Sequence, residues 1–266
     1  MRPVRQIPEM PNPAQIGTME ARPILFVHGA FHGAWCWEEA IRELAARGRR
    51  AIAIDLPGHG ADRTPRGNVG LEDYAARIGT TLGRIDVPVT LVAHSMGGIP
   101  ATIAAERAGE RVAALIYLSA LVPLDGETLN GISERNPDNR LERALSPAAD
   151  GASHTMDPAE AQHFFFHDCA TDVAARAAAS LTPQPLRPLL ESADLSAGAV
   201  DARPRGYIVM RDDRALSPER QRFFAARCRG IIVTEIDGGH SPFLAQPAAF
   251  VDTLCSLETR IAARTS

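Results

Sequence analysis

The 266-residue sequence contains no lysine, only four cysteines and no long apolar run. Its 28 basic residues are therefore all arginine, which we interpret as a coding bias, and with 32 acidic residues the net charge is -4. A charge this small and this evenly spread argues against a nucleic-acid partner. The cysteines form no Cys-x-x-Cys pair, so the sequence indicates neither a zinc site nor a disulfide framework. They stand at Cys36, Cys169, Cys228 and Cys255.

A membrane-spanning or secreted protein is not indicated either. No stretch approaches the ~20 uninterrupted apolar residues that span a bilayer. The first residues have a basic start, but proline recurs in them and an apolar run is missing, unlike a secretory signal. We therefore expect residues 1–21 to form a flexible N-terminal arm and the protein to be cytoplasmic, with no membrane partner.

From residue 22 onward, short apolar runs rich in Val, Ile and Leu alternate with longer segments of helical period. This pattern predicts a parallel sheet with crossover helices, and the predicted strands are apolar nearly throughout, as expected when both faces of a strand are covered. Between residues 123 and 202 the strand rhythm stops, so we expect a helical cap inserted into one catalytic domain of residues 22–122 and 203–266. The predicted strands are 23–29, 50–58, 87–95, 113–123, 205–213 and 230–239, and the predicted helices are 36–47, 71–84, 96–108, 217–228 and 247–263.

The segment VTLVAHSMGGIPATIAAERA reads as a strand, a one-residue corner and a helix, with Ser95 at the corner. This is the arrangement of a nucleophile elbow. So tight a turn needs small residues two positions to either side, and Ala93 and Gly97 meet that need, although the first is usually glycine. Helix capping alone explains a serine here but not the small residues on both sides. We predict that Ser95 is a nucleophile.

A serine hydroxyl needs a base, and the imidazole of that base needs a carboxylate partner. His240 directly follows the last predicted strand, in the chain order Ser, Asp, His of this motif. Asp212 and Asp213 both end the preceding strand and point in opposite directions, so the residues alone leave the choice between them open. Asp125, after the strand before that, is a third candidate.

Acyl transfer also needs donors for an oxyanion, for which two backbone N–H groups are usual. We expect one from Met96, after the nucleophile, and one from Ala30, in the loop after the first strand. Gly29 would let this loop approach the site closely. The expected substrate pocket consists of Gly29, His28, Phe31, Phe164, Phe165 and Ser241.

Two histidine pairs have the spacing of metal ligands. His28 and His32 fall on a strand end and its loop, with no carboxylate beside them. His163 and His167 would share a helical face, but the glutamate of a His-Glu-x-x-His site is missing. We therefore expect no metal and no cofactor.

The motifs HGAFHGAW, AHSMGG, YIVMRDD and GGH together resemble the α/β-hydrolase family over residues 23–262. Within it they look like the branch of plant methylesterases, hydroxynitrile lyases and related bacterial esterases. The resemblance implies a mainly parallel six-stranded sheet with flanking helices and an inserted helical cap. In that branch the acid is the aspartate six residues after the tyrosine that opens the strand, so the resemblance favours Asp213.

The resemblance also separates the activities of the branch. Its lyases carry Thr or Asn at the position of Gly29, and one lyase group carries Lys at the position of Ser241. We therefore expect a serine carboxylic-ester hydrolase that acts on small to medium hydrophobic or aromatic esters through an acyl-enzyme. A small-molecule ester is the expected partner, and a homodimer is left open. The alternatives are a hydroxynitrile lyase, or another C–C bond-cleaving enzyme of this fold, and a non-catalytic ligand receptor.

Overall fold

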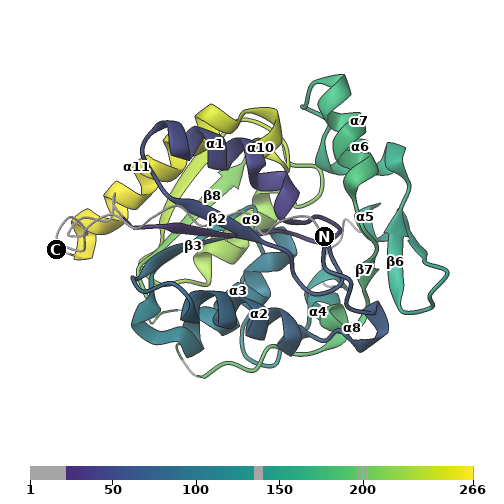
Figure 1. Cartoon of the computed structure of the whole chain (residues 1–266), viewed down its shortest axis with the longest axis horizontal. Helices are drawn as coiled ribbons and strands as arrows, with labels where there is room; N and C mark the ends of the chain where they lie inside the picture. Colours follow the sequence, from purple (N-terminus) through teal and green to yellow (C-terminus); the bar gives the residue numbers. More distant parts are fainter. Residues whose placement is uncertain (1–21, 135–139, 197, 199–200, 202, 266) are drawn as a thin grey trace, which may run out of the picture.

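A computed structural model describes residues 22–134, 140–196, 198, 201 and 203–265, so the predicted arm of residues 1–21 lies outside the described residues. Six parallel strands form one sheet in the order β2-β1-β3-β4-β8-β9 (Figure 1). Each strand overlaps one that the sequence predicts, which confirms the parallel sheet. The strands are β1 Ile24–Val27, β2 Ala51–Ile54, β3 Val89–His94, β4 Val112–Leu118, β8 Arg205–Met210 and β9 Ile232–Ile236.

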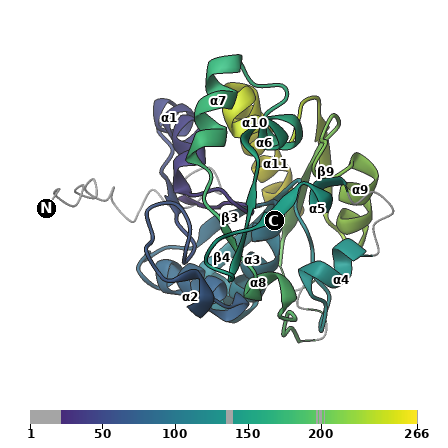
Figure 2. The same cartoon turned by 90° about the vertical axis from the view of Figure 1, so that its right-hand side faces the viewer.

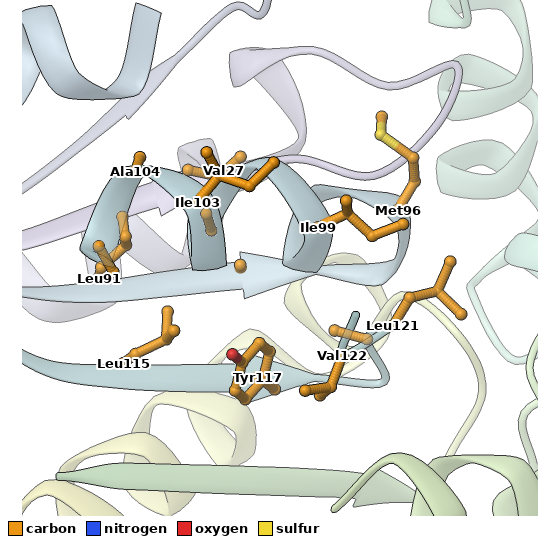
Figure 3. Close-up of a cluster of buried hydrophobic side chains, with 14 of the residues drawn as sticks. Val27, Leu91, Met96, Ile99, Ile103, Ala104, Leu115, Tyr117, Leu121 and Val122 are labelled. Carbon is orange, nitrogen blue, oxygen red and sulfur yellow. The ribbon is translucent and has the colours of Figure 1, made fainter. Parts of the chain in front are cut away.

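The central strands are apolar over most of their length because each face packs against a separate core. In β3, Leu91 belongs to one hydrophobic cluster and Val92 to the other. Figure 3 shows part of the first cluster, in which Ile99 and Ile103 of α3 (Gly98–Ala108) pack on this face of the sheet. A strand buried on both faces has no solvent side, so polar residues do not alternate with apolar ones.

Helices cover both faces of the sheet. Residues of α2, α3 and α9 join the first core, and residues of α1, α10 and α11 join the second. The start of α9 follows its sequence signal, since Ser217 accepts a hydrogen bond from the N–H of Arg220 and Pro218 takes the first helical position. Within the described ranges, no helix has both the length and the apolar character to cross a bilayer. The bounds are α1 Glu38–Ala46, α2 Leu71–Gly83, α9 Pro218–Ala226, α10 Pro242–Ala245 and α11 Pro247–Thr265.

The segment between β4 and β8 holds the expected helices together with a small antiparallel sheet of order β5-β6-β7. The sequence did not predict this sheet, because its strands have two to four residues, too few for a period to be visible. Its elements are α4 Leu129–Glu134, α5 Arg140–Arg143, β5 Leu145–Pro147, β6 Ser153–Met156, α6 Pro158–Phe165, α7 Thr171–Ser180, β7 Gln184–Pro185 and α8 Arg187–Leu190.

This insertion occupies one end of the molecule. In Figure 1, α6, α7 and β6 lie opposite the last turns of α11. Figure 2 looks onto that end, and the insertion lies in front of β3 and β4. Since ligands of open α/β sheets bind beyond the carboxyl ends of the strands, the insertion and the strand ends together define where a site is expected.

Candidate active site

Ser95 occupies a sharp corner between β3 and α3. Its φ is 53°, in the left-handed region that residues other than glycine rarely adopt. The carbonyl oxygen of Ser95 accepts a 3.1 Å hydrogen bond from the N–H of Leu121, which holds the corner against the end of β4. A Cβ atom at Gly97 would lie 2.5 Å from the carbonyl oxygen of His28, so only glycine fits there. The corner thus has the strained, closely packed geometry of a nucleophile elbow.

His240 and Asp213 form a buried hydrogen-bonded pair. The Nδ1–H of His240 donates to Oδ2 of Asp213 over 2.8 Å. The other oxygen, Oδ1, accepts the backbone N–H groups of Ala215 and Leu216 over 2.8 and 2.9 Å. The carboxylate is therefore held in place by its own loop, and it fixes the orientation of the imidazole ring.

The three aspartates that are candidates for the carboxylate partner of His240 differ in their hydrogen-bond partners. Asp212 is exposed and accepts the N–H of Gly238 over 2.9 Å, whereas Asp213 faces His240. Asp125 accepts the N–H of Leu195 over 3.0 Å and so holds a turn of the insertion. The geometry agrees with the resemblance, which favours Asp213.

Ser95 and His240 line the same cavity, which has a volume of about 360 Å³. No hydrogen bond joins their side chains in the part of the chain that the structure describes. In enzymes without substrate this bond is often long and tightens when substrate binds. The Ser95 hydroxyl and the His240 imidazole are therefore placed at one site, with Asp213 behind the imidazole.

Both predicted oxyanion donors, Ala30 and Met96, border this cavity, and so does Phe31. Figure 3 shows Met96 beyond the end of β3, at the end of the cluster where Leu121 also lies. The loop of Ala30 and Phe31 is held by the insertion, since the N–H of Thr182 donates to the carbonyl oxygen of Phe31 over 2.8 Å. The loop after β1 and the corner after β3 thus meet at the cavity.

The other residues predicted for the pocket do not border the cavity. The ring of His28 is buried, with Nδ1–H donating to the carbonyl of Gly29 over 2.8 Å and Nε2 accepting the N–H of Leu56 over 3.0 Å. Ser241 is fully buried. Phe164 and Phe165 pack in the hydrophobic cluster of the insertion, although the Phe165 ring centroid is 5.5 Å from that of His240.

Gly29 also lies outside the cavity lining, but it is packed directly against Ser95. A Cβ atom on Gly29 would be 2.8 Å from Cβ of Ser95 and 2.9 Å from Nδ1 of His94. Real Cβ atoms do not approach other atoms so closely. The absence of a side chain at Gly29 therefore lets the loop backbone approach Ser95 closely, as predicted.

The histidines whose spacing resembles that of metal ligands do not form a metal site among the described residues. Nδ1–H of His32 donates to the carbonyl of Ala30 over 2.7 Å, and burial lowers the pKa of His32 to about 3. Helix α6 ends at Phe165, so His167 lies beyond it and the predicted shared helical face with His163 is wrong. Within the described ranges no three His, Cys, Asp or Glu side chains gather as metal ligands would.

The model of the alpha/beta hydrolase family matches residues 24–253. The chain belongs to the alpha/beta hydrolase family. This hydrolase is 28% identical to Methylesterase 7 of Arabidopsis thaliana over 262 residues, which cover 91% of this chain and 96% of that protein. It is 25% identical to Esterase PIR7B of Oryza sativa subsp. japonica over 267 residues, which cover 92% and 99%. The solved structure of a pyrethroid hydrolase from Sphingobium faniae has a TM-score of 0.79 and 24% identity, covering 90% of this chain and 98% of that one, a likeness that shows the fold.

Two side chains of this hydrolase that the sequence analysis missed complete the surroundings of Asp213. The Ser119 hydroxyl donates to Oδ2 of Asp213 and lies 3.4 Å from Nδ1 of His240. Nε2 of Gln221 donates to the same carboxylate oxygen over 3.1 Å. Neither residue belongs to a recognisable motif. Ser119 follows β4 and could have been found only by asking which polar residue ends a neighbouring strand.

Proposed function

We propose that this alpha/beta hydrolase is a serine carboxylic-ester hydrolase. The observation that carries the proposal is the hydrogen bond between Asp213 and His240, because it orients the imidazole at the cavity that also exposes Ser95. The names of the similar proteins, Methylesterase 7 and Esterase PIR7B, support hydrolysis of a carboxylic ester.

In the proposed mechanism, Oγ of Ser95 attacks the ester carbonyl while Nε2 of His240 accepts its proton. The Asp213 carboxylate stabilises the imidazolium that forms, and the N–H groups of Ala30 and Met96 bind the oxyanion. The imidazolium then gives its proton to the leaving alcohol. Water, activated by the same histidine, attacks the acyl-enzyme, releases the acid and restores Ser95.

The size and lining of the cavity support small to medium substrates with apolar groups. A volume of about 360 Å³ is at the lower end of ordinary small-molecule sites. Most of the lining residues are apolar. They are Ala30, Phe31, Met96, Leu121, Leu129, Leu141, Leu145, Leu189, Ala215 and Leu216.

The second candidate, a hydroxynitrile lyase, is less favoured by the surroundings of Gly29. The Thr or Asn that the related lyases carry at this position would need space that Ser95 and His94 occupy. The third candidate, a ligand receptor without activity, gives no reason for a buried carboxylate that orients the imidazole at the same cavity as Ser95.

The test combines a substrate panel with substitution of the nucleophile. We expect the protein to hydrolyse some of a panel of methyl, aryl and lactone substrates, and Ser95→Ala to lower kcat by about 10⁴-fold to 10⁶-fold without unfolding the protein. A fluorophosphonate probe should label Ser95, identified by peptide mapping. Ser180→Ala, on the exposed face of α7, is the matched control.

Two outcomes would contradict the proposal. Undiminished ester turnover in Ser95→Ala would rule out the serine mechanism. Cyanide release from mandelonitrile without any ester hydrolysis would favour the lyase instead.

A further inference from the structure

One part of the cavity wall is polar and comes from the insertion. Glu142 lies on α5 and His154 on β6, and both border the cavity with Ser95 and His240. Oε2 of Glu142 and Nδ1 of His154 are buried, and neither atom has a hydrogen-bond partner among the residues that the structure describes. A buried polar atom without a partner is destabilising. Native proteins therefore keep such an atom mainly where it has another use, such as a hydrogen bond to a bound molecule.

The small antiparallel sheet sets the position of His154. His154 of β6 pairs with Pro147 of β5 and with Gln184 of β7. Glu142 lies on α5, between two apolar lining residues, Leu141 and Leu145. His154 is therefore held on a paired framework, and Glu142 lies in a mainly apolar part of the lining, where a hydrogen bond is stronger than in water.

Two other polar residues of the lining are already used by the protein. Gln184 accepts the N–H of Phe31 over 3.4 Å and donates to the Tyr74 hydroxyl over 3.2 Å. Nη2 of Arg220 donates to the carbonyl of Ile132 over 3.1 Å. Asn130 also borders the cavity but is exposed, so among the lining residues of the insertion Glu142 and His154 are the ones with a buried polar atom that lacks a partner.

We propose that Glu142 and His154 form a subsite that binds a hydrogen-bond donor on the substrate, namely a hydroxyl or an amino group. A carboxylate offers only acceptors, so its partner must donate, whereas an imidazole nitrogen can do either. An acidic substituent placed against Glu142 would be repelled by its carboxylate. The subsite rests on the proposed ester hydrolysis at Ser95 and narrows its substrates to hydroxylated or amino-substituted esters.

The test uses two matched series of esters that differ in one group. Methyl alkanoates and methyl ω-hydroxyalkanoates, from butanoate to decanoate, are compared by kcat/KM. We expect the hydroxylated ester to be preferred by about 10-fold to 100-fold at one chain length, mainly through KM, and not at shorter lengths. The ω-amino ester of that length then tells whether a cationic donor is bound better than a neutral one.

Variants assign the preference to the two residues. Glu142→Leu should bring the ratio of the two series to about one and improve turnover of the plain ester, since the unpaired carboxylate is gone. His154→Leu should lower the ratio in part. Glu142→Gln keeps an acceptor oxygen, so it should retain preference for the hydroxyl and lose preference for the amine. Glu160→Leu, at an exposed position of α6, is the control and should change neither series.

The outcomes separate the subsite from the esterase function. Turnover of plain esters with a ratio near one at every length overturns the subsite and leaves the esterase intact. A strong preference that survives both Glu142→Leu and His154→Leu overturns the assignment to these residues. Failure to hydrolyse either series overturns the proposed function and the subsite with it. If Glu142→Leu does not fold, the ratio of the two series in the wild type and in His154→Leu still tests the subsite.

Discussion

The backbone N–H of Gly239 donates a 2.6 Å hydrogen bond to Oδ2 of Asp168. Gly239 precedes His240, whereas Asp168 belongs to the insertion, so the insertion contacts the loop of the proposed base directly. A Cβ on Gly239 would lie 2.7 Å from Oδ1 of Asp168, which explains the glycine. On the other side, the N–H of Gly238 donates to Asp212 over 2.9 Å. The loop that carries the imidazole is thus held between the sheet and the insertion.

Removing this contact should impair catalysis more than folding. We expect Asp168→Ala to lower kcat about tenfold with little change in KM, because the histidine loop loses a hydrogen bond to a charged group. Steady-state kinetics with a panel ester measures this. Asp157→Ala is the control, since Asp157 caps α6 by accepting the N–H of Ala159 over 2.8 Å. It should lower Tm without lowering kcat, and an equal loss of kcat in both variants would contradict the role of Asp168.

The buried carboxylate should be essential and its neighbour should not. We expect Asp213→Asn to lower kcat by about 10⁴-fold, because an amide cannot stabilise the imidazolium and favours the wrong tautomer. Asp212→Asn, one position away but exposed, should lower it far less. Thermal unfolding of both variants separates catalysis from stability. Similar kinetics for the two would refute the assignment of Asp213.

The packing of Gly29 against Ser95 predicts that the Thr of the related lyases cannot simply be introduced at position 29. In Gly29→Thr, Ser95 must move to relieve a 2.8 Å approach to Cβ, and we expect kcat for esters to fall by about 10² or more. Cyanide release from mandelonitrile should not appear. Gly79→Thr is the control, because a Cβ on Gly79 meets nothing within 4 Å. A variant at Gly29 that releases cyanide would contradict this steric argument.

Buried neutral histidines should make the fold sensitive to acid. Burial lowers the pKa of His32 from 6.5 to about 3 and that of His28 from 6.5 to about 4. Below pH 6.5 the unfolded chain therefore binds more protons than the folded chain, and stability falls as pH falls toward these values. For His32 the loss at pH 5 amounts to about 2 kcal/mol.

Substitution of one of these histidines should reduce the acid sensitivity. In His32→Asn the amide can still donate to the carbonyl of Ala30. The free energy of unfolding, measured with urea, falls between neutral pH and pH 5. We expect this fall to be smaller in His32→Asn than in the wild type by about 2 kcal/mol. An unchanged difference would show that His32 does not titrate in this way.

Much of the fold is readable from the sequence because the core strands obey a simple rule. Both faces of β1, β3, β4 and β8 are buried, so each strand is an apolar run that ends at a polar or small residue. Ser95 is recognisable because its turn restricts the residues around it. Asp213 is not separable from Asp212 by the residues alone, since the side-chain direction depends on the turn after β8.

The remaining features depend on contacts between distant segments. Ser119 meets Asp213 across 94 positions of the chain, and Asp168 meets Gly239 across 71. The strands β5 to β7 are too short to show a period, and their pairing holds His154 at the cavity wall. No local pattern predicts such contacts. Ser119 meets Asp213 because β4 and β8 are neighbours in the sheet, and the other contacts arise from the way the insertion folds back onto the sheet.

The order of the strands places the proposed nucleophile and base in regions of unequal local stability. Ser95 follows β3, which is buried throughout between two neighbours, whereas His240 follows β9, a partly exposed strand at the sheet edge. Edge segments open at lower cost than central ones. Mild urea should therefore inactivate the protein by releasing the imidazole while the centre stays folded, so hydrolysis should cease before the far-ultraviolet circular dichroism of the sheet and its helices changes.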